Sequence, residues 1–254
     1  MSKPYSLSPK GDLEIAAGLG IVEGVETFSM YGAVDDPAAG VLTDVAIDIA
    51  GVEVALPDFA GESLEIVSSD PADTATMALT GLGPNGKKLA ADTTVVLNGA
   101  TPVAIPGLFS RVNFLTCASD EGIAGDVQVR RVGGTPVYIT ATEEAQQSQQ
   151  ALFSVPAGWK AQVTTLVGSM QKSQGVDTDA VIVAQLKGAT QQKWRRPFAF
   201  GMQRSGNTAT IFDNRIPSTI EGPADIKLST QASAAGAVVS GWISGLITRA
   251  GGAD

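Results

Sequence analysis

The residue types that most often carry chemistry in proteins are scarce in this sequence. Histidine is absent and Cys117 is the single cysteine among 254 residues. Without histidine there is no serine–histidine or cysteine–histidine nucleophile and no histidine-ligated metal, and one cysteine allows neither a thiolate zinc site nor an intrachain disulfide. A serine–lysine pair stays open in principle, but no motif marks one. We therefore expect no catalytic residue, no metal and no cofactor, and we interpret Cys117 as a small core residue.

Carboxylates are the next candidates for chemistry, and two acidic clusters, Asp35-Asp36 and Asp177-Thr178-Asp179, fall in expected loops. Calcium prefers several carboxylate and carbonyl oxygens around a sharp glycine turn, and neither stretch matches an EF-hand loop. Two carboxylates could also form a glycosidase pair. However, 26 acidic residues allow a great many pairs, and nothing distinguishes one of them. We interpret both clusters as solvated loops.

The stretch Gly81-Leu-Gly-Pro-Asn-Gly86 has the glycine spacing of a dinucleotide-binding loop. That motif requires a strand before the loop and a helix after it. Here Pro84 and the lysines at 87 and 88 lead into another expected strand. The stretch is therefore predicted to be a hairpin turn.

The densest basic stretch is Lys193-Trp194-Arg195-Arg196. Arginine beside an aromatic residue is typical of an interface anchor. Three readings stay open: a protein–protein contact, an exposed strand end in solvent, and a glycan or nucleic-acid contact. We take Lys193, Trp194, Arg195 and Arg196 as the candidate interface residues.

Short segments of alternating apolar and polar residues must position these side chains. The chain has 29 glycines and 13 prolines, which together exceed their average share of about 12 % of residues. Many of them lie between the segments, where they favour turns. Asn98-Gly99 is the clearest turn, because it tolerates the positive φ angles of a tight hairpin. With the turn at Pro84-Asn85-Gly86, it predicts a three-stranded meander over 76–104. The expected strands are 41–49, 64–68, 76–82, 93–98, 111–116, 126–132, 136–141, 161–168, 180–187, 208–213 and 225–230.

Helical patterns are rare. Residues 141–152 lack glycine and proline but have almost no apolar face, so they predict a polar connector or one short helix. Residues 238–248 fit both a helix and a strand, and their two glycines and β-branched residues favour the strand. The predicted class is therefore all-β with little helix, arranged as tandem β-sandwich or jelly-roll-like domains.

Charge divides the chain. Residues 1–127 contain 5 Lys and Arg against 18 Asp and Glu, whereas residues 128–254 contain 12 against 8. We predict an acidic domain over 1–145 and a second domain over 146–254, with 1–12 as an extended arm. The unequal charge reflects either two solvated surfaces or halves that meet different neighbours, or each other, in an assembly.

The total charge of −9 argues against non-specific binding to nucleic acid or to anionic membranes. The first ten residues show no apolar signal segment. The uncharged run between Lys227 and Arg249 contains Gly241-Trp-Ile-Ser-Gly245, but its many serines make it a poor membrane span. We expect a soluble chain made in a reducing compartment.

A faint internal repeat links the two halves. The segment Gly24–Gly32 followed by Gly40–Asp44 is similar to Gly158–Gly168 followed by Gly175–Asp179. The second half needs extra residues over about 187–212 to keep this register. Duplication and convergent β-sandwich patterning both explain the similarity.

Several strand and turn motifs follow one another along the middle of the chain. They are Glu65-Ile-Val-Ser-Ser-Asp-Pro-Ala-Asp-Thr74, Leu79-Thr-Gly-Leu-Gly-Pro-Asn-Gly86, Thr94-Val-Val-Leu-Asn-Gly-Ala-Thr-Pro-Val103, Phe109-Ser-Arg-Val-Asn113, Gly125-Asp-Val-Gln-Val129 and Gln147-Ser-Gln-Gln-Ala-Leu-Phe-Ser-Val-Pro-Ala-Gly158. Together these motifs resemble a family of structural proteins of tailed bacteriophages, common in marine phages. The resemblance covers roughly 62–168 and, loosely, the C-terminal part of the chain. Pro84 stands where the family has aspartate, and Phe153 where it has tyrosine.

The resemblance implies a non-enzymatic virion protein assembled in the host cytoplasm. Within the virion it favours a capsid accessory or decoration protein that binds the major capsid protein or other virion proteins, as a homo-oligomer. Two alternatives are a neck or tail ring or adaptor component and a receptor- or glycan-binding adhesin. None of these roles involves nucleic acid or a membrane as partner.

Overall fold

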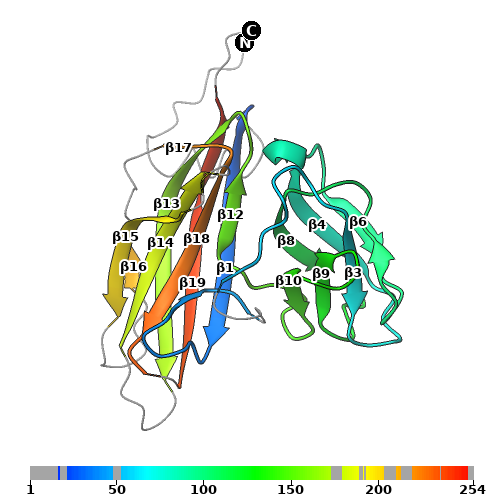
Figure 1. The fold of residues 1–254 in the computed structure, drawn as a ribbon, viewed down its shortest axis with the longest axis horizontal. Coiled ribbons are helices and arrows are strands. Elements are labelled where there is room, and N and C mark those ends of the chain that lie inside the picture. The colour runs from blue at the N-terminus through cyan, green and yellow to red at the C-terminus, as the bar shows by residue number, and fades with distance from the viewer. Residues whose placement is uncertain are drawn as a thin grey trace, which may run out of the picture.

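The computed structural model describes residues 17, 22–47, 53–172, 179–188, 191, 193–202, 210–212, 219–234 and 236–250. Almost all of the regular structure in these residues is antiparallel β-sheet, which confirms the all-β prediction. Three sheets form, and we number them I to III. Figure 1 shows a tall pair of sheets beside a smaller curled body.

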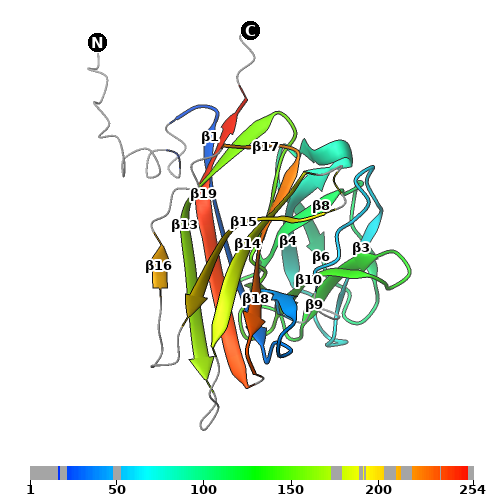
Figure 2. The ribbon, with the colours of Figure 1, turned by 60° about the vertical axis from the view of Figure 1, so that its left-hand side comes forward.

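Sheets I and II face each other as a β-sandwich. Alternate residues of each strand point between the two sheets, so that Ile243, Ile182 and Ile226 are all fully buried in one shared core. The long strands of both sheets run the height of the molecule in Figure 2. Sheet I contains β1 (Val25–Asp35), β13 (Trp159–Lys172), β16 (Thr210–Phe212), β17 (Ile220–Glu221) and β19 (Ala237–Arg249); sheet II contains β2 (Leu42–Asp44), β12 (Leu152–Val155), β14 (Ala180–Gly188), β15 (Arg195–Met202) and β18 (Ala224–Ala232).

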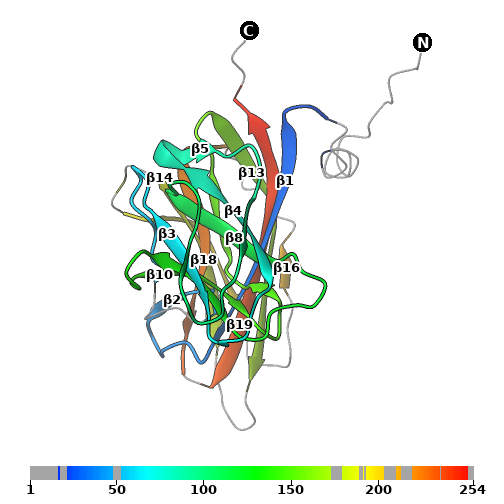
Figure 3. The ribbon, with the colours of Figure 1, turned by 90° about the vertical axis from the view of Figure 1, so that its right-hand side faces the viewer.

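Sheet III curls around a second core that includes Leu64, Phe109, Leu115 and Val129. When the smaller body faces the viewer, its strands β3, β4, β8 and β10 lie in front of β14 and β18 (Figure 3). The sheet contains β3 (Leu64–Ser68), β4 (Thr76–Gly83), β5 (Lys87–Lys88), β6 (Thr93–Val96), β7 (Val103–Ala104), β8 (Arg111–Cys117), β9 (Val127–Arg131), β10 (Val137–Thr142) and β11 (Gln147–Ser148), with a 3-10 turn at Pro84–Gly86.

Strand pairing crosses the predicted boundary at residues 145–146. β1 pairs with β19 along its whole length, from Val25–Thr248 to Asp35–Val238, and β2 pairs with β18. The sandwich is thus built from both ends of the described chain, and sheet III is formed by the segment between them. β1 itself was missing from the expected strands, although Phe28 and Met30 alternate with the exposed Thr27, Ser29 and Tyr31.

The Asn98-Gly99 turn forms, but the meander predicted over 76–104 is wrong. Thr101 N–H donates to the Asn98 carbonyl at 3.0 Å across the turn, and β6 pairs with β4 as expected. β7, however, pairs with β3 at the far edge of sheet III. The reason is that Gly99 is bound to another turn: its N–H donates to the Asp73 carbonyl at 2.8 Å, which carries the chain away from β6.

Two other segments differ from expectation, and one ambiguity is resolved. The strand expected over 41–49 is regular only over 42–44, and residues 48–49 lie outside the described part. The window 141–152 forms the end of β10, a turn and β11, with no helix. The segment 238–248 is a strand, as favoured, because it is part of β19.

Candidate functional site

Trp194 lies just before β15, beside the end of β14, whose last residues are Lys187 and Gly188. Its ring is half-buried, and its indole Nε1 donates a hydrogen bond to Glu53 Oε1 at 2.8 Å. The ammonium group of Lys227 lies 4.1 Å from the ring centroid and that of Lys187 lies 5.4 Å from it. Both distances are within the range of a cation–π interaction, so both lysines contribute to holding the indole.

Lys227 is the centre of the network beneath the tryptophan. Its side chain is only 3 % exposed, and Nζ donates to Asp44 Oδ2 at 2.8 Å and to Glu53 Oε1 at 3.0 Å. Asp44 also accepts from Ser229 Oγ at 2.6 Å and from the backbone of Val54 at 2.8 Å. A buried ammonium is costly unless it is paired in this way. The network therefore fixes the linker that carries Glu53 to sheet II.

The surroundings of Glu53 favour its ionised form. Burial raises the pKa of its carboxyl, but the hydrogen bond and charge of Lys227, with the Trp194 indole and the charge of Lys187, outweigh burial and lower the pKa below its usual value of 4.5. Both carboxylates beside the tryptophan, Asp44 and Glu53, are thus engaged by Lys227. Their role in this arrangement is to hold the tryptophan and the linker in place.

We call Lys187, Lys193, Trp194, Arg195 and Arg196 the Trp194 patch. The side chains of Lys193, Arg195 and Arg196 are exposed, and within the described part of the chain none of the patch cations forms an ion pair. A cavity of about 430 Å³ opens beside the ring, lined by Gln185, Lys193, Trp194, Arg196 and residues of the Lys227 network. Three of the four residues singled out by sequence, Lys193, Trp194 and Arg196, thus line one cavity. Arg195 pairs with Leu186, which packs against the sandwich core, so its side chain leaves the strand on the other face. The structure does not test the use of these residues as an interface.

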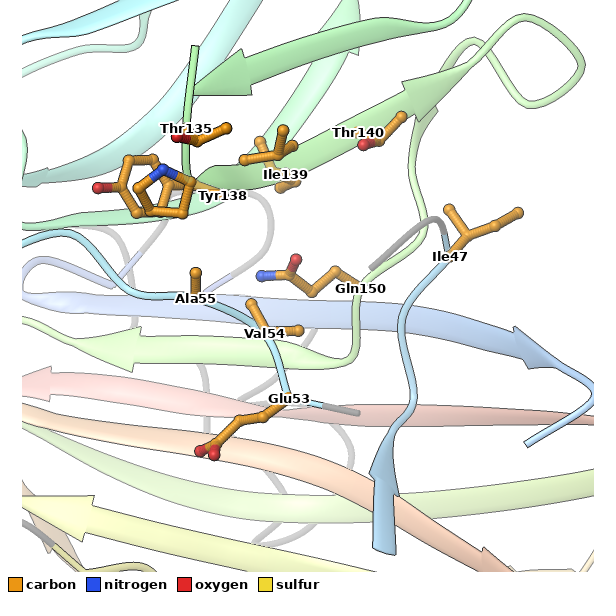
Figure 4. Close-up of a pocket in the computed structure, with 11 residues that line it drawn as sticks. Ile47, Glu53, Val54, Ala55, Thr135, Tyr138, Ile139, Thr140 and Gln150 are labelled. Atoms are coloured by element: carbon orange, nitrogen blue, oxygen red, sulfur yellow. The ribbon is translucent and has the colours of Figure 1, made fainter. Parts of the chain in front are cut away.

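A second cavity, of about 300 Å³, lies between β10 and the linker that follows β2. Figure 4 shows Tyr138 and Ile139 on one side of it and Val54 and Gln150 on the other. The Glu53 carboxylate points away from Tyr138, towards the strands of the sandwich (Figure 4). Glu53 lines both this cavity and the one beside Trp194.

Sheet III is attached to sheet II by a buried ion pair that sequence reasoning missed. Arg111 of β8 binds both carboxylate oxygens of Asp225 of β18, at 2.7 and 2.9 Å, and both side chains are less than 5 % exposed. Ser154 of β12 donates to the same carboxylate at 2.7 Å, and its backbone N–H donates to Asn113 at 3.0 Å. Asp225 and Lys227 lie on the outer face of β18, and the core residues Ile226 and Leu228 alternate with them. In the sequence this pattern indicates a strand with one polar face exposed to solvent, so nothing marked Asp225 as a buried ion-pair partner.

The remaining candidates of the sequence analysis fall on structural positions. Asp36 accepts a hydrogen bond from the backbone of Gly236 at 2.5 Å. Asp177 lies outside the described residues, and no cluster of three or more metal-ligating side chains occurs in the part of the chain that is described. Cys117 is half-buried against the sheet III core. No helix in the described ranges is long and apolar enough to cross a membrane.

Comparison with known proteins gives little to add to this geometry. No family model matches the chain, and no curated protein matches it. The solved structures that it resembles include infectious bursal disease virus VP2 in its subviral particle, at 14 % identity and a TM-score of 0.23, covering 91 % of this chain and 74 % of that one. Another is a structure of infectious bursal disease virus Gt strain, at 14 % identity and a TM-score of 0.22, covering 90 % and 78 %. At TM-scores this low the likeness carries no argument about fold or function.

Proposed function

We propose that this chain is a non-enzymatic bacteriophage virion protein, a capsid accessory or decoration protein that binds the head shell. The phage-like motifs support this proposal, because they fall on the strands and turns that build sheet III and its connection to the sandwich. Leu79–Gly86 forms the end of β4 and the 3-10 turn, and Phe109–Asn113 leads into β8, where Arg111 attaches sheet III to sheet II. The motifs thus specify much of sheet III and its attachment to the sandwich.

The Trp194 patch is the observation that carries the proposed role. Side chains that only keep a protein soluble are free to move, whereas this tryptophan is fixed by Glu53 and by two lysines, beside exposed cations that have no partner in the described part of the chain. An aromatic ring held in place, with Arg196 and Lys193 beside it, has the composition of an interface hot spot. Repeated over many copies on a shell, contacts that are individually weak become stable.

Particle incorporation tests this role. We expect the triple variant Trp194→Ala/Arg195→Ala/Arg196→Ala to be incorporated into phage particles on the order of thirtyfold less than the wild-type chain, because the loss of a hot-spot residue costs about 2 kcal/mol or more. A second variant, Lys193→Ala/Arg195→Ala/Arg196→Ala, keeps Trp194 and its buried partners. Its incorporation should fall too, and its thermal unfolding should match the wild type.

The matched control removes two exposed cations from other surfaces, Lys87→Ala/Arg249→Ala. It should be incorporated normally. Undiminished incorporation of both patch variants would exclude the patch as the contact. Complete absence of the wild-type chain from particles would exclude the virion role itself.

One observation favours the adhesin alternative. Tyr31 of β1 and Trp242 of β19 are direct cross-strand neighbours on the outer face of sheet I, and they are 47 % and 45 % exposed. Exposed aromatic rings of this kind serve as platforms for sugar rings. Glycan binding by the pure protein that is lost in Tyr31→Ala/Trp242→Ala would favour this alternative over a shell contact.

A further inference from the structure

Four exposed carboxylates gather on two turns of sheet III. Asp120 and Glu121 lie between β8 and β9, and Glu143 and Glu144 lie between β10 and β11. Gln146 joins the two turns: its side-chain oxygen accepts a hydrogen bond from the backbone of the first turn at 2.6 Å, and its amide donates to a backbone carbonyl of the second at 2.5 Å. We call these four residues the acidic turns.

The acidic turns have no compensating cation nearby in the chain. No lysine or arginine occurs between Arg111 and Arg130 or between Arg131 and Lys160. Arg130 and Arg131 are themselves paired with other glutamates of sheet III. None of the four carboxylates forms an ion pair within the described ranges. Like charges held this close repel each other, and a cationic partner would remove that repulsion.

The Trp194 patch carries positive charge that is unpaired within the described ranges. It offers four cations, Lys187, Lys193, Arg195 and Arg196, of which the last three are exposed, and these have no ion-pair partner in the described part of the chain. The patch belongs to sheet II and the acidic turns to sheet III, and no hydrogen bond or ion pair among the described residues joins the two surfaces. One chain therefore carries two surfaces of matched and opposite charge.

We infer that the acidic turns of one copy bind the Trp194 patch of the next copy, so that the chains associate head to tail. The contact joins two different surfaces, so it is heterologous, and it forms a closed ring if the rotation between copies closes and an open array if it does not. This inference rests on the proposed function and makes it more specific, because it assigns the contact that the Trp194 patch makes in the particle to the neighbouring copy rather than to the shell itself. Charge complementarity identifies that partner as a second copy of this chain.

Self-association of the pure full-length chain tests the inference. Analytical ultracentrifugation should show oligomers in about 10 mM salt and monomers in about 1 M salt, because the Debye length falls from about 30 Å to about 3 Å. The variant Lys193→Glu/Arg195→Glu/Arg196→Glu reverses the patch, and Glu121→Lys/Glu143→Lys/Glu144→Lys reverses the turns. Each alone should associate at least about tenfold more weakly than the wild type.

Mixing the two reversed variants gives the decisive result. In the mixture, the basic turns of one variant face the acidic patch of the other, and the basic patch of the first faces the acidic turns of the second. Association should therefore return on mixing. All six substituted side chains are exposed, so the thermal unfolding of both variants should match the wild type.

Two results would overturn the inference: a wild-type chain that is monomeric in low salt, or reversed variants whose mixture stays monomeric. Failure of the proposed function gives a different pattern. A chain that self-associates as described but is absent from phage particles keeps the inference and excludes the virion role. A wild-type chain that is incorporated into particles but stays monomeric in low salt keeps the virion role and excludes the inference.

Discussion

The Glu62 carboxylate, just before β3, joins two other strands of sheet III through Arg131 of β9 and Tyr138 of β10. Arg131 binds both of its oxygens, at 2.6 and 3.0 Å, and the Tyr138 hydroxyl donates to it as well. The Arg131 hydrogen bonds, against an opposing effect of burial and with help from Tyr138, lower the pKa of Glu62 from 4.5 to about 2. Burial and the hydrogen bond to Glu62 raise the pKa of Tyr138 to about 12.

The lowered pKa of Glu62 predicts an acid-dependent loss of stability. The unfolded chain takes up a proton near pH 4.5 and the folded chain only near 2, so the contribution of Glu62 is complete above pH 4.5 and is lost as the pH falls towards 2. At pH 7 we expect Glu62→Gln to lower the free energy of unfolding by about 1–2 kcal/mol, since Arg131 is half exposed and its charge is screened.

Thermal unfolding of both chains between pH 7 and pH 2 measures this difference. It should shrink to nearly zero at the acid end. Glu144→Gln, which removes an exposed carboxylate without an ion pair in the described part of the chain, serves as the control and should follow the wild type throughout. A difference in thermal stability between Glu62→Gln and the wild type that stays constant from pH 7 to pH 2 would contradict the lowered pKa of Glu62.

Among the single residues of the candidate site, the exposed ones were identified from the sequence and the buried ones were missed. Trp194 and its neighbouring cations were recognisable because an aromatic residue inside a basic run is unusual in an acidic chain. Lys227 and Asp44 were not, because each occupies a polar position of an alternating strand, a position that normally faces water. Only the linker and Trp194, which cover that face, make them buried partners.

Among the elements, most strands were predictable within one or two residues, because period-2 patterns bounded by glycine and proline specify both their extent and their buried face. The pairing of those strands was less predictable. β6 and β7 are neighbours in sequence and separate in the sheet, since the Gly99 turn is bound to the backbone of Asp73. β1 and β13, whose sequences are similar, both pair with β19, and the duplication stays a hypothesis.

Gly32 is the residue on which the position of β1 depends most directly. A Cβ atom there would lie 2.0 Å from the carbonyl oxygen of Val45 and 2.4 Å from the backbone nitrogen of Ala151. Both are main-chain atoms that cannot move without disturbing sheet II. We therefore expect Gly32→Ala to lower the free energy of unfolding by about 1–3 kcal/mol, as overpacking does in other cores.

Gly201 of β15 is the matched control. It also lies within a strand, and a Cβ atom there would meet nothing within 4 Å. Chemical denaturation should show Gly201→Ala to be as stable as the wild type or slightly more stable, because alanine restricts the unfolded chain. Equal stability of the two variants would mean that β1 does not lie as close to Val45 as described.

For the whole molecule, the arrangement of the bodies is the part that sequence did not reveal. The change of charge and the polar stretch near residue 145 suggested a boundary, yet the first strands of the described chain complete sheets made of the last ones. Docking of sheet III depends on Arg111 and Asp225, which are 114 residues apart. Neither residue is unusual in its local sequence, so no local pattern could have paired them.

A body of this kind, with two surfaces of opposite charge available for contact, suits a component present in many copies. Counting this chain in purified particles, by quantitative mass spectrometry with imaging of the heads, tests the central claim most directly. The account predicts on the order of hundreds of copies per particle, arranged over the head shell. A small closed-ring number located at the neck or tail would contradict the head role, and no copies at all would contradict the virion role.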